Sequence, residues 1–145
     1  MILAIDIGNT NIVVGCIDKE KIYLTERIST IRTKTELEYA IDIKTILDIH
    51  HINRADIEGA IISSVVPQIT FAARLAVQKI LKKDAMIVGP GVKTGLNILL
   101  DNPGELGTGM YILSNTSGIH GAAALFYPDV QEKISEALGE NYYAL

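Results

Sequence analysis

Three short apolar runs separated by two polar turns fill the first 28 residues, and this pattern restricts the fold more than any other feature. The runs cover residues 2–7, 12–17 and 22–28, which are lengths typical of strands and too short for ordinary helices. The intervening turns contain glycine, asparagine, aspartate and lysine, residues that favour tight connections. The sequence therefore predicts an antiparallel meander of three strands, with the alternating third run as an edge-side strand.

After Thr30 the apolar spacing changes from a period of two to the helical period. We expect a helix over residues 35–49 whose inner face carries five apolar residues: Leu37, Ala40, Ile41, Ile46 and Leu47. A short buried strand follows at residues 59–64. Pro67 then opens a second helix through residue 81, with Phe71, Leu75, Ile80 and Leu81 on its apolar side. A short central strand at residues 85–88 completes an α/β arrangement in which a meander leads into parallel strands.

Composition excludes several classes of protein. Apolar residues make up 48% and charged residues 21% of the 145 residues, which argues against a disordered, collagenous or coiled-coil chain. No apolar run approaches the roughly 18–20 residues of a membrane span, and we expect no signal peptide at residues 1–7. The net charge of −4 and the lack of a basic cluster argue against binding to nucleic acid. The single cysteine, Cys16, is expected in the core of a cytoplasmic protein.

The residues most suggestive of chemistry follow the first strand. A carboxylate at the end of a buried strand is costly without a partner, and Asp6 could hold Mg²⁺ through water. A turn with glycine and small polar residues can cradle phosphate oxygens. The candidate phosphate-binding residues are Asp6, Gly8, Asn9, Thr10 and Asn11, with Asp6 as the metal ligand. The pattern Asp-x-Gly-x-Thr is short, so an ordinary hairpin turn with an Asx cap explains it equally well.

Five longer blocks raise the weight of the functional interpretation. In order, they are DIGNTNIV at residues 6–13, RIST at 27–30, IISSVVP at 61–67, VGPGVKTGL at 88–96 and DNP at 101–103. Over residues 1–106 the chain thereby resembles the type III pantothenate kinases of the actin/Hsp70/sugar-kinase superfamily. The resemblance implies a ribonuclease-H-like half-domain with a mixed sheet, ATP-dependent phosphorylation of pantothenate in coenzyme A biosynthesis, and a homodimer. It also implies Mg²⁺ with a monovalent cation, K⁺ or NH₄⁺.

The resemblance assigns roles to residues in two loops. The turn after the first strand corresponds to the family's first phosphate-binding loop. A second segment lies near the pantothenate pocket of the family, and its candidate substrate-binding residues are Gly89, Gly91, Lys93, Thr94 and Gly95.

The family pattern fails after the DNP block. The family has Gly-Ala-Asp-Arg there, in which the aspartate is the general base and the arginine binds substrate, but residues 107–110 read Gly-Thr-Gly-Met. Gly109 cannot accept a proton and Met110 carries no charge, so no catalytic residue is assigned. Leu100 replaces a substrate-contacting tyrosine, and a second phosphate loop of the type Asp-Phe-Gly-Thr-Ala-Thr does not occur. We expect a truncated, catalytically impaired pantothenate kinase, or alternatively a non-catalytic remnant or fusion that binds nucleotide weakly.

Residues 107–145 differ in composition from the rest. They hold one of the 13 basic residues but five of the eight aromatic ones, and we expect a short β-α-β-like segment of separate or divergent origin. Its stretch SNTSGIHGAAALFYPDV resembles an uncharacterised family of clostridial proteins. Histidines at 50, 51 and 120 lack metal-ligand spacing, and Ser63 and Ser64 are better explained as capping or packing residues than as nucleophiles. An apolar sheet face without its covering half would favour self-association.

Overall fold

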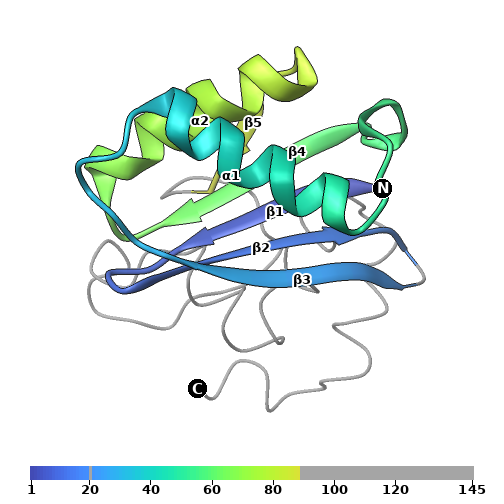
Figure 1. Cartoon of the computed structure of the whole chain (residues 1–145), viewed down its shortest axis with the longest axis horizontal. Helices are drawn as coiled ribbons and strands as arrows, with labels where there is room; N and C mark the ends of the chain where they lie inside the picture. Colours follow the sequence, from blue (N-terminus) through green and yellow to red (C-terminus); the bar gives the residue numbers. More distant parts are fainter. Residues whose placement is uncertain (20, 89–145) are drawn as a thin grey trace, which may run out of the picture.

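The computed structural model describes residues 1–19 and 21–88 (Figure 1). In these ranges the chain forms five strands and two α-helices with one 3₁₀ turn. The elements are β1 (Ile2–Ile7), β2 (Asn11–Ile17), β3 (Ile22–Ser29), α1 (Glu36–Ile49), the 3₁₀ turn Arg54–Asp56, β4 (Gly59–Ser64), α2 (Pro67–Leu81) and β5 (Ala85–Ile87). The predicted order of strands and helices is therefore confirmed for this part of the chain.

The strands form one mixed sheet in the order β3-β2-β1-β4-β5. β1 pairs antiparallel with β2, and β2 antiparallel with β3, which confirms the predicted meander. β1 and β4 are parallel, as are β4 and β5. Among the described strands, β3 lies at the edge of the sheet, as predicted. β5 was expected to be central, but it is the outermost described strand on the other side, because each parallel strand is added beyond the one before it.

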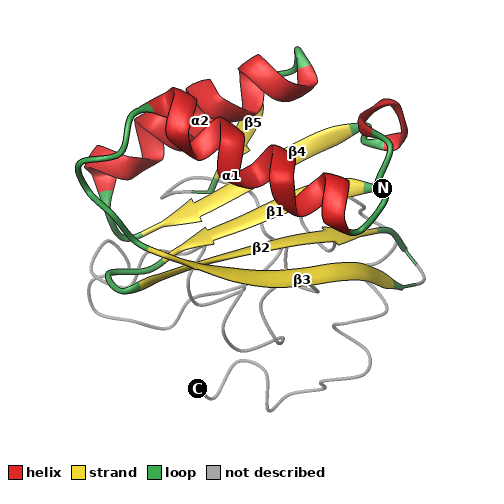
Figure 2. Ribbon diagram, viewed as in Figure 1, coloured by secondary structure: helices red, strands yellow, loops and turns green. Residues whose placement is uncertain are grey.

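Both helices cover the same face of the sheet (Figure 2). The core between the helices and the sheet contains alternate residues of each strand, since successive strand side chains point to opposite faces. In β1 these residues are Leu3, Ile5 and Ile7, all at most 1% exposed, and in β2 they include Cys16 as predicted. Burial raises the pKa of the Cys16 thiol to about 12. The even-numbered residues of β1 therefore lie on the face opposite the helices.

The buried faces of the helices differ from the predicted ones. Leu37 and Ile41 are more than half exposed, and Tyr39 and Ile43 are buried in their place. Helix α1 is apolar on more than one side, so spacing alone did not identify the side that contacts the sheet. In α2, Phe71 is 65% exposed although it was expected to face the core. The residues of α2 that are buried are smaller on average than the four predicted for its apolar side. They are Ile69, Ala73, Ala76, Val77 and Leu81.

Candidate functional site

The turn between β1 and β2 is tight and closed by its own backbone. The Gly8 amide donates to the Asn11 carbonyl oxygen at 2.9 Å, which leaves Asn9 and Thr10 exposed at the tip. A Cβ on Gly8 would lie 3.0 Å from that same oxygen, closer than side-chain carbons normally approach. Glycine at this position therefore avoids a close contact that an alanine Cβ would make with the turn backbone, and its backbone φ lies outside the left-handed region.

Asp6 lies on the sheet face opposite the helices, one residue before the end of β1. Its neighbours Ile5 and Ile7 point into the helix-covered core, so the carboxylate points the other way. Burial raises the pKa of Asp6 above its ordinary value of 3.8, and no hydrogen bond or ion pair to residues 1–19 or 21–88 opposes that shift. A half-buried carboxylate without a partner in the described part of the chain is the arrangement expected of a group that binds a ligand cation.

The strand register places polar side chains beside Asp6. Asp6 is directly opposite Ser63 of β4 and Val13 of β2, and Val13 is in turn opposite Arg27 of β3. Paired residues share a face of the sheet, so a serine, a carboxylate and an arginine lie in one line across four strands. Ser63 is 1% exposed, whereas Arg27 is exposed. The pattern combines one anionic and one cationic group on the same face.

Thr30 and Arg32, which follow β3, both contact the β1–β2 turn. The sequence analysis did not predict these contacts. Thr30 donates its hydroxyl to the Gly8 carbonyl at 2.7 Å and its amide to the Thr10 carbonyl at 2.9 Å. Arg32 donates from Nη2 to Asn9 Oδ1 at 3.0 Å. The only advance signal was the position of Thr30 in the RIST block, because these contacts depend on how β3 aligns with β2.

Other predicted residues have structural roles. Ser64 accepts a hydrogen bond from the Val66 amide at 3.0 Å just before α2, but the N-cap of this helix is Val66 and no side chain caps it, so the capping role expected for Ser64 is wrong. His50 is the C-cap of α1, and its Nε2 lies 2.7 Å from Glu26 Oε1; His51 is exposed. Beside Ser64, a cavity of about 300 Å³ is lined by α2 and by the end of β5.

Several of the predicted sites fall outside the described residues. These are the substrate-binding candidates between residues 89 and 95, the base position Gly109 and the whole segment 107–145. Within the described ranges, no group of three or more histidine, cysteine, aspartate or glutamate residues could enclose a metal ion. Mg²⁺ commonly takes one or two carboxylates and keeps several waters, so a lone Asp6 fits this ion better than it fits zinc. No helix in residues 1–19 and 21–88 is long and apolar enough to cross a bilayer.

Comparison with known proteins identifies the family. The family model of type III pantothenate kinase matches residues 2–114. The chain belongs to the type III pantothenate kinase family. It is 48% identical over 120 residues to a type III pantothenate kinase of Geobacillus sp. (strain WCH70), covering 83% of this chain and 46% of that relative. It is 47% identical over 107 residues to the enzyme of Bifidobacterium adolescentis, covering 74% and 42%.

The family assignment agrees with the fold. The five-stranded mixed sheet with its helices is an α/β half-domain of the type expected for this kinase superfamily. The chain spans about half the length of the curated relatives it matches. The family match extends to residue 114, and the domain boundary expected at residue 106 stays a prediction.

Proposed function

We propose that the β1–β2 turn binds the phosphate groups of ATP and that Asp6 holds the accompanying Mg²⁺ through water. The observation that carries this proposal is the half-buried Asp6 carboxylate, which has no partner among the described residues and lies beside a tight, exposed polar turn. The family supports it, since the relatives are named as pantothenate kinases. A bound Mg²⁺ would neutralise charge on the phosphates. The chain itself contributes exposed side-chain and backbone donors at Asn9 and Thr10, and a glycine that allows a close turn.

Pantothenate is the phosphoryl acceptor that we propose for the family site, with K⁺ or NH₄⁺ as a further cofactor. Residues 89–95 are the proposed pantothenate contacts on the strength of the sequence blocks. A cytoplasmic setting fits these substrates and the single cysteine. We also propose a homodimer, which the exposed apolar side chains of Leu37, Ile41 and Ile49 on α1 support. Light scattering would then give twice the chain mass of 15.8 kDa, and a monomer at all concentrations would contradict it.

We further propose that the 145-residue chain alone does not turn over pantothenate. Gly109 and Met110 stand where the family has its base and its substrate arginine, and a general base commonly contributes about 10²–10⁴-fold to the rate. The alternative, a non-catalytic module that binds nucleotide, rests on the same two residues, Gly109 and Met110. The test is ADP release at saturating ATP and pantothenate, with Gly109→Asp alongside. Clear turnover by the unmodified chain, lost in Asp6→Ala, would contradict impairment.

Calorimetric titration with Mg·ATP tests the binding proposal itself. The unmodified chain should bind, and Asp6→Asn should weaken binding at least about tenfold because the carboxylate no longer holds the ion. Asp56→Asn is the matched control, since Asp56 is an exposed aspartate in the 3₁₀ turn that precedes β4. Equal binding by Asp6→Asn and Asp56→Asn would overturn the assignment of Asp6.

A further inference from the structure

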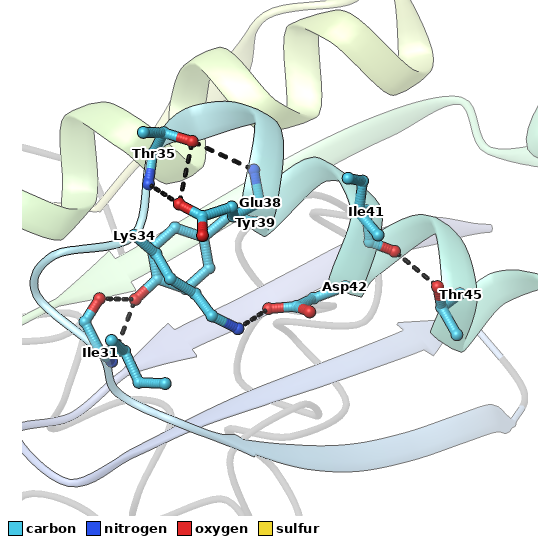
Figure 3. A network of polar contacts seen from close by, with 8 residues as sticks. All are labelled: Ile31, Lys34, Thr35, Glu38, Tyr39, Ile41, Asp42 and Thr45. Carbon is cyan, nitrogen blue, oxygen red and sulfur yellow. Dashed lines mark hydrogen bonds and ion pairs between the residues drawn. The ribbon is translucent and has the colours of Figure 1, made fainter.

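The backbone between β3 and α1 is held by a buried tyrosine. Tyr39 is 1% exposed, and its hydroxyl donates to the Ile31 carbonyl oxygen at 2.6 Å and accepts from the Ile31 amide at 3.2 Å (Figure 3). One side chain thus satisfies both polar backbone groups of a residue outside any helix or strand. The Ile31 side chain is 40% exposed, so its own packing does little to fix this position.

Ile31 lies between the two residues that contact the β1–β2 turn. On one side, Thr30 binds the carbonyl oxygens of Gly8 and Thr10; on the other, Arg32 binds the Asn9 side chain. Fixing the Ile31 backbone therefore limits the movement of both neighbours. Tyr39 is thus connected to the turn only indirectly, through the Ile31 backbone and the three hydrogen bonds that Thr30 and Arg32 make.

The start of α1 holds the same segment from the other end. Thr35 and Glu38 form a reciprocal capping box, with the Thr35 amide donating to Glu38 Oε2 at 2.8 Å. Lys34 donates to Asp42 at 2.5 Å, and this contact raises the pKa of the Lys34 ammonium. Tyr39 therefore lies on a helix whose first turn is itself fixed relative to residues 31–35 (Figure 3).

The positive charge of Arg32 makes this side of the turn suitable for an anionic ligand. A guanidinium carries five N–H donors, and the bond to Asn9 uses one of them. Its position beside an exposed polar turn suits an anion with several oxygens, because arginine binds phosphate through paired donors. A phosphate on the turn would then meet a cation from the β3–α1 connection as well as the turn's own donors.

We propose that Tyr39 is a positioning residue that, through the Ile31 backbone, fixes Thr30 and Arg32 as one wall of the phosphate site. This inference rests on the proposed binding of Mg·ATP at the β1–β2 turn. Binding is tighter when donors are already held in place, because less conformational freedom is lost when the ligand arrives. The segment after β3 thus supplies order to a turn whose tip is exposed.

Titration of the 145-residue chain with Mg·ATP measures the effect of the wall. Tyr39→Phe keeps the buried ring and removes the two bonds from Tyr39 to Ile31, leaving, among the described residues, only the bond from the Lys34 amide to the Ile31 carbonyl. Thr30→Val removes the bond to Gly8 while keeping the side-chain shape. Each should raise the Kd about three- to tenfold, because the segment then has to be ordered when the ligand binds. Thr30→Ser keeps the hydroxyl and should bind Mg·ATP as tightly as the unmodified chain. Arg32→Gln keeps a donor for Asn9 but loses the charge, and it should weaken binding more than Arg54→Gln, a control with the same charge change in the 3₁₀ turn.

Thr45→Val is the matched control for the hydroxyl variants. Thr45 also donates to a carbonyl, that of Ile41, at 2.7 Å, but on the exposed side of α1 (Figure 3). It should lower the melting temperature no more than Thr30→Val, because its bond is exposed, and it should leave the Kd within about twofold. If Tyr39→Phe and Thr30→Val bind Mg·ATP as tightly as Thr45→Val, the inference is overturned.

Amide hydrogen exchange separates this inference from the proposed function. Loss of the wall should speed exchange of the Gly8 and Thr30 amides in Tyr39→Phe, with no change in Thr45→Val. If that pattern appears but the unmodified chain binds no Mg·ATP, the ATP function is overturned while the positioning of the turn stands. If exchange at Gly8 and Thr30 is unchanged in Tyr39→Phe, the positioning role is refuted whatever the chain binds.

Discussion

Replacing Gly8 with alanine tests the tight turn on which the candidate site depends. The added Cβ would meet the Asn11 carbonyl oxygen at 3.0 Å, so that carbonyl has to move by a few tenths of an ångström. The same oxygen accepts the Gly8 amide at 2.9 Å, and the Gly8 carbonyl is itself fixed by Thr30 at 2.7 Å. The strain therefore falls on backbone atoms held from two sides, which relax less easily than a flexible side chain.

The expected cost follows from two opposing effects. Overpacking a fixed site typically destabilises by about 1–3 kcal/mol. Alanine restricts the unfolded chain more than glycine does, which returns about 0.4–1 kcal/mol. The midpoints of these two ranges leave a net loss of about 1.3 kcal/mol for Gly8→Ala, equivalent to a fall in melting temperature of roughly 3–5 °C for a chain of this size.

Urea unfolding followed by circular dichroism measures this loss as a lower midpoint with an unchanged slope. Asn9→Ala is the control within the same turn, because it removes only the exposed bond from Arg32 and should cost less than Gly8→Ala. A Gly8→Ala variant as stable as the unmodified chain would refute the argument that close backbone approach requires glycine here.

Three further predictions concern charge and capping. Burial raises the folded pKa of Asp6, so its ionisation opposes folding: stability falls as pH rises from about the unfolded value of 3.8 through the folded pKa. Asp6→Asn should therefore be more stable than the unmodified chain at pH 7, with the difference disappearing below about pH 4 in pH-dependent denaturation; a destabilised Asp6→Asn at pH 7 would show that the carboxylate has a stabilising partner. The Cys16 thiol, with its pKa near 12 and no exposed surface, should react with a disulfide reagent at pH 8 only as fast as the chain unfolds; rapid reaction in native buffer would show that β2 is not buried as described. Thr35→Ala removes the capping box with Glu38 and should cost about 1 kcal/mol in thermal unfolding, and no loss would mean that packing alone sets the start of α1.

The order of elements could be predicted because local patterns determine it. Alternation and turn residues specify β1 to β3, and Pro67 marks the first residue of α2. The buried side of each helix could not be predicted in full. Leu37 and Ile41 are as apolar as the residues that are buried, and Tyr39 has a hydroxyl that suggests exposure until its partner, the Ile31 backbone, is known.

The candidate site also has a part that could be predicted from the sequence and a part that could not. Asp6 and the turn after it are contiguous in sequence, so their chemistry could be inferred from residue types and order. Thr30 and Arg32 lie about 20 residues further along the chain and reach the turn only because β3 pairs with β2, with Ser29 opposite Asn11. Contacts that depend on the register between strands are not encoded in any one segment, and the sequence pattern did not reveal them.

The β1–β2 turn, with Asp6, is the phosphate-binding site that we propose. A titration of the isotopically labelled chain with Mg·ATP, followed by amide chemical shifts, tests it most directly. The largest shift changes should fall on Gly8, Asn9, Thr10 and Asn11 and should be lost in Asp6→Asn. The absence of shift changes at saturating nucleotide, or changes confined to the cavity beside Ser64, would contradict the claim.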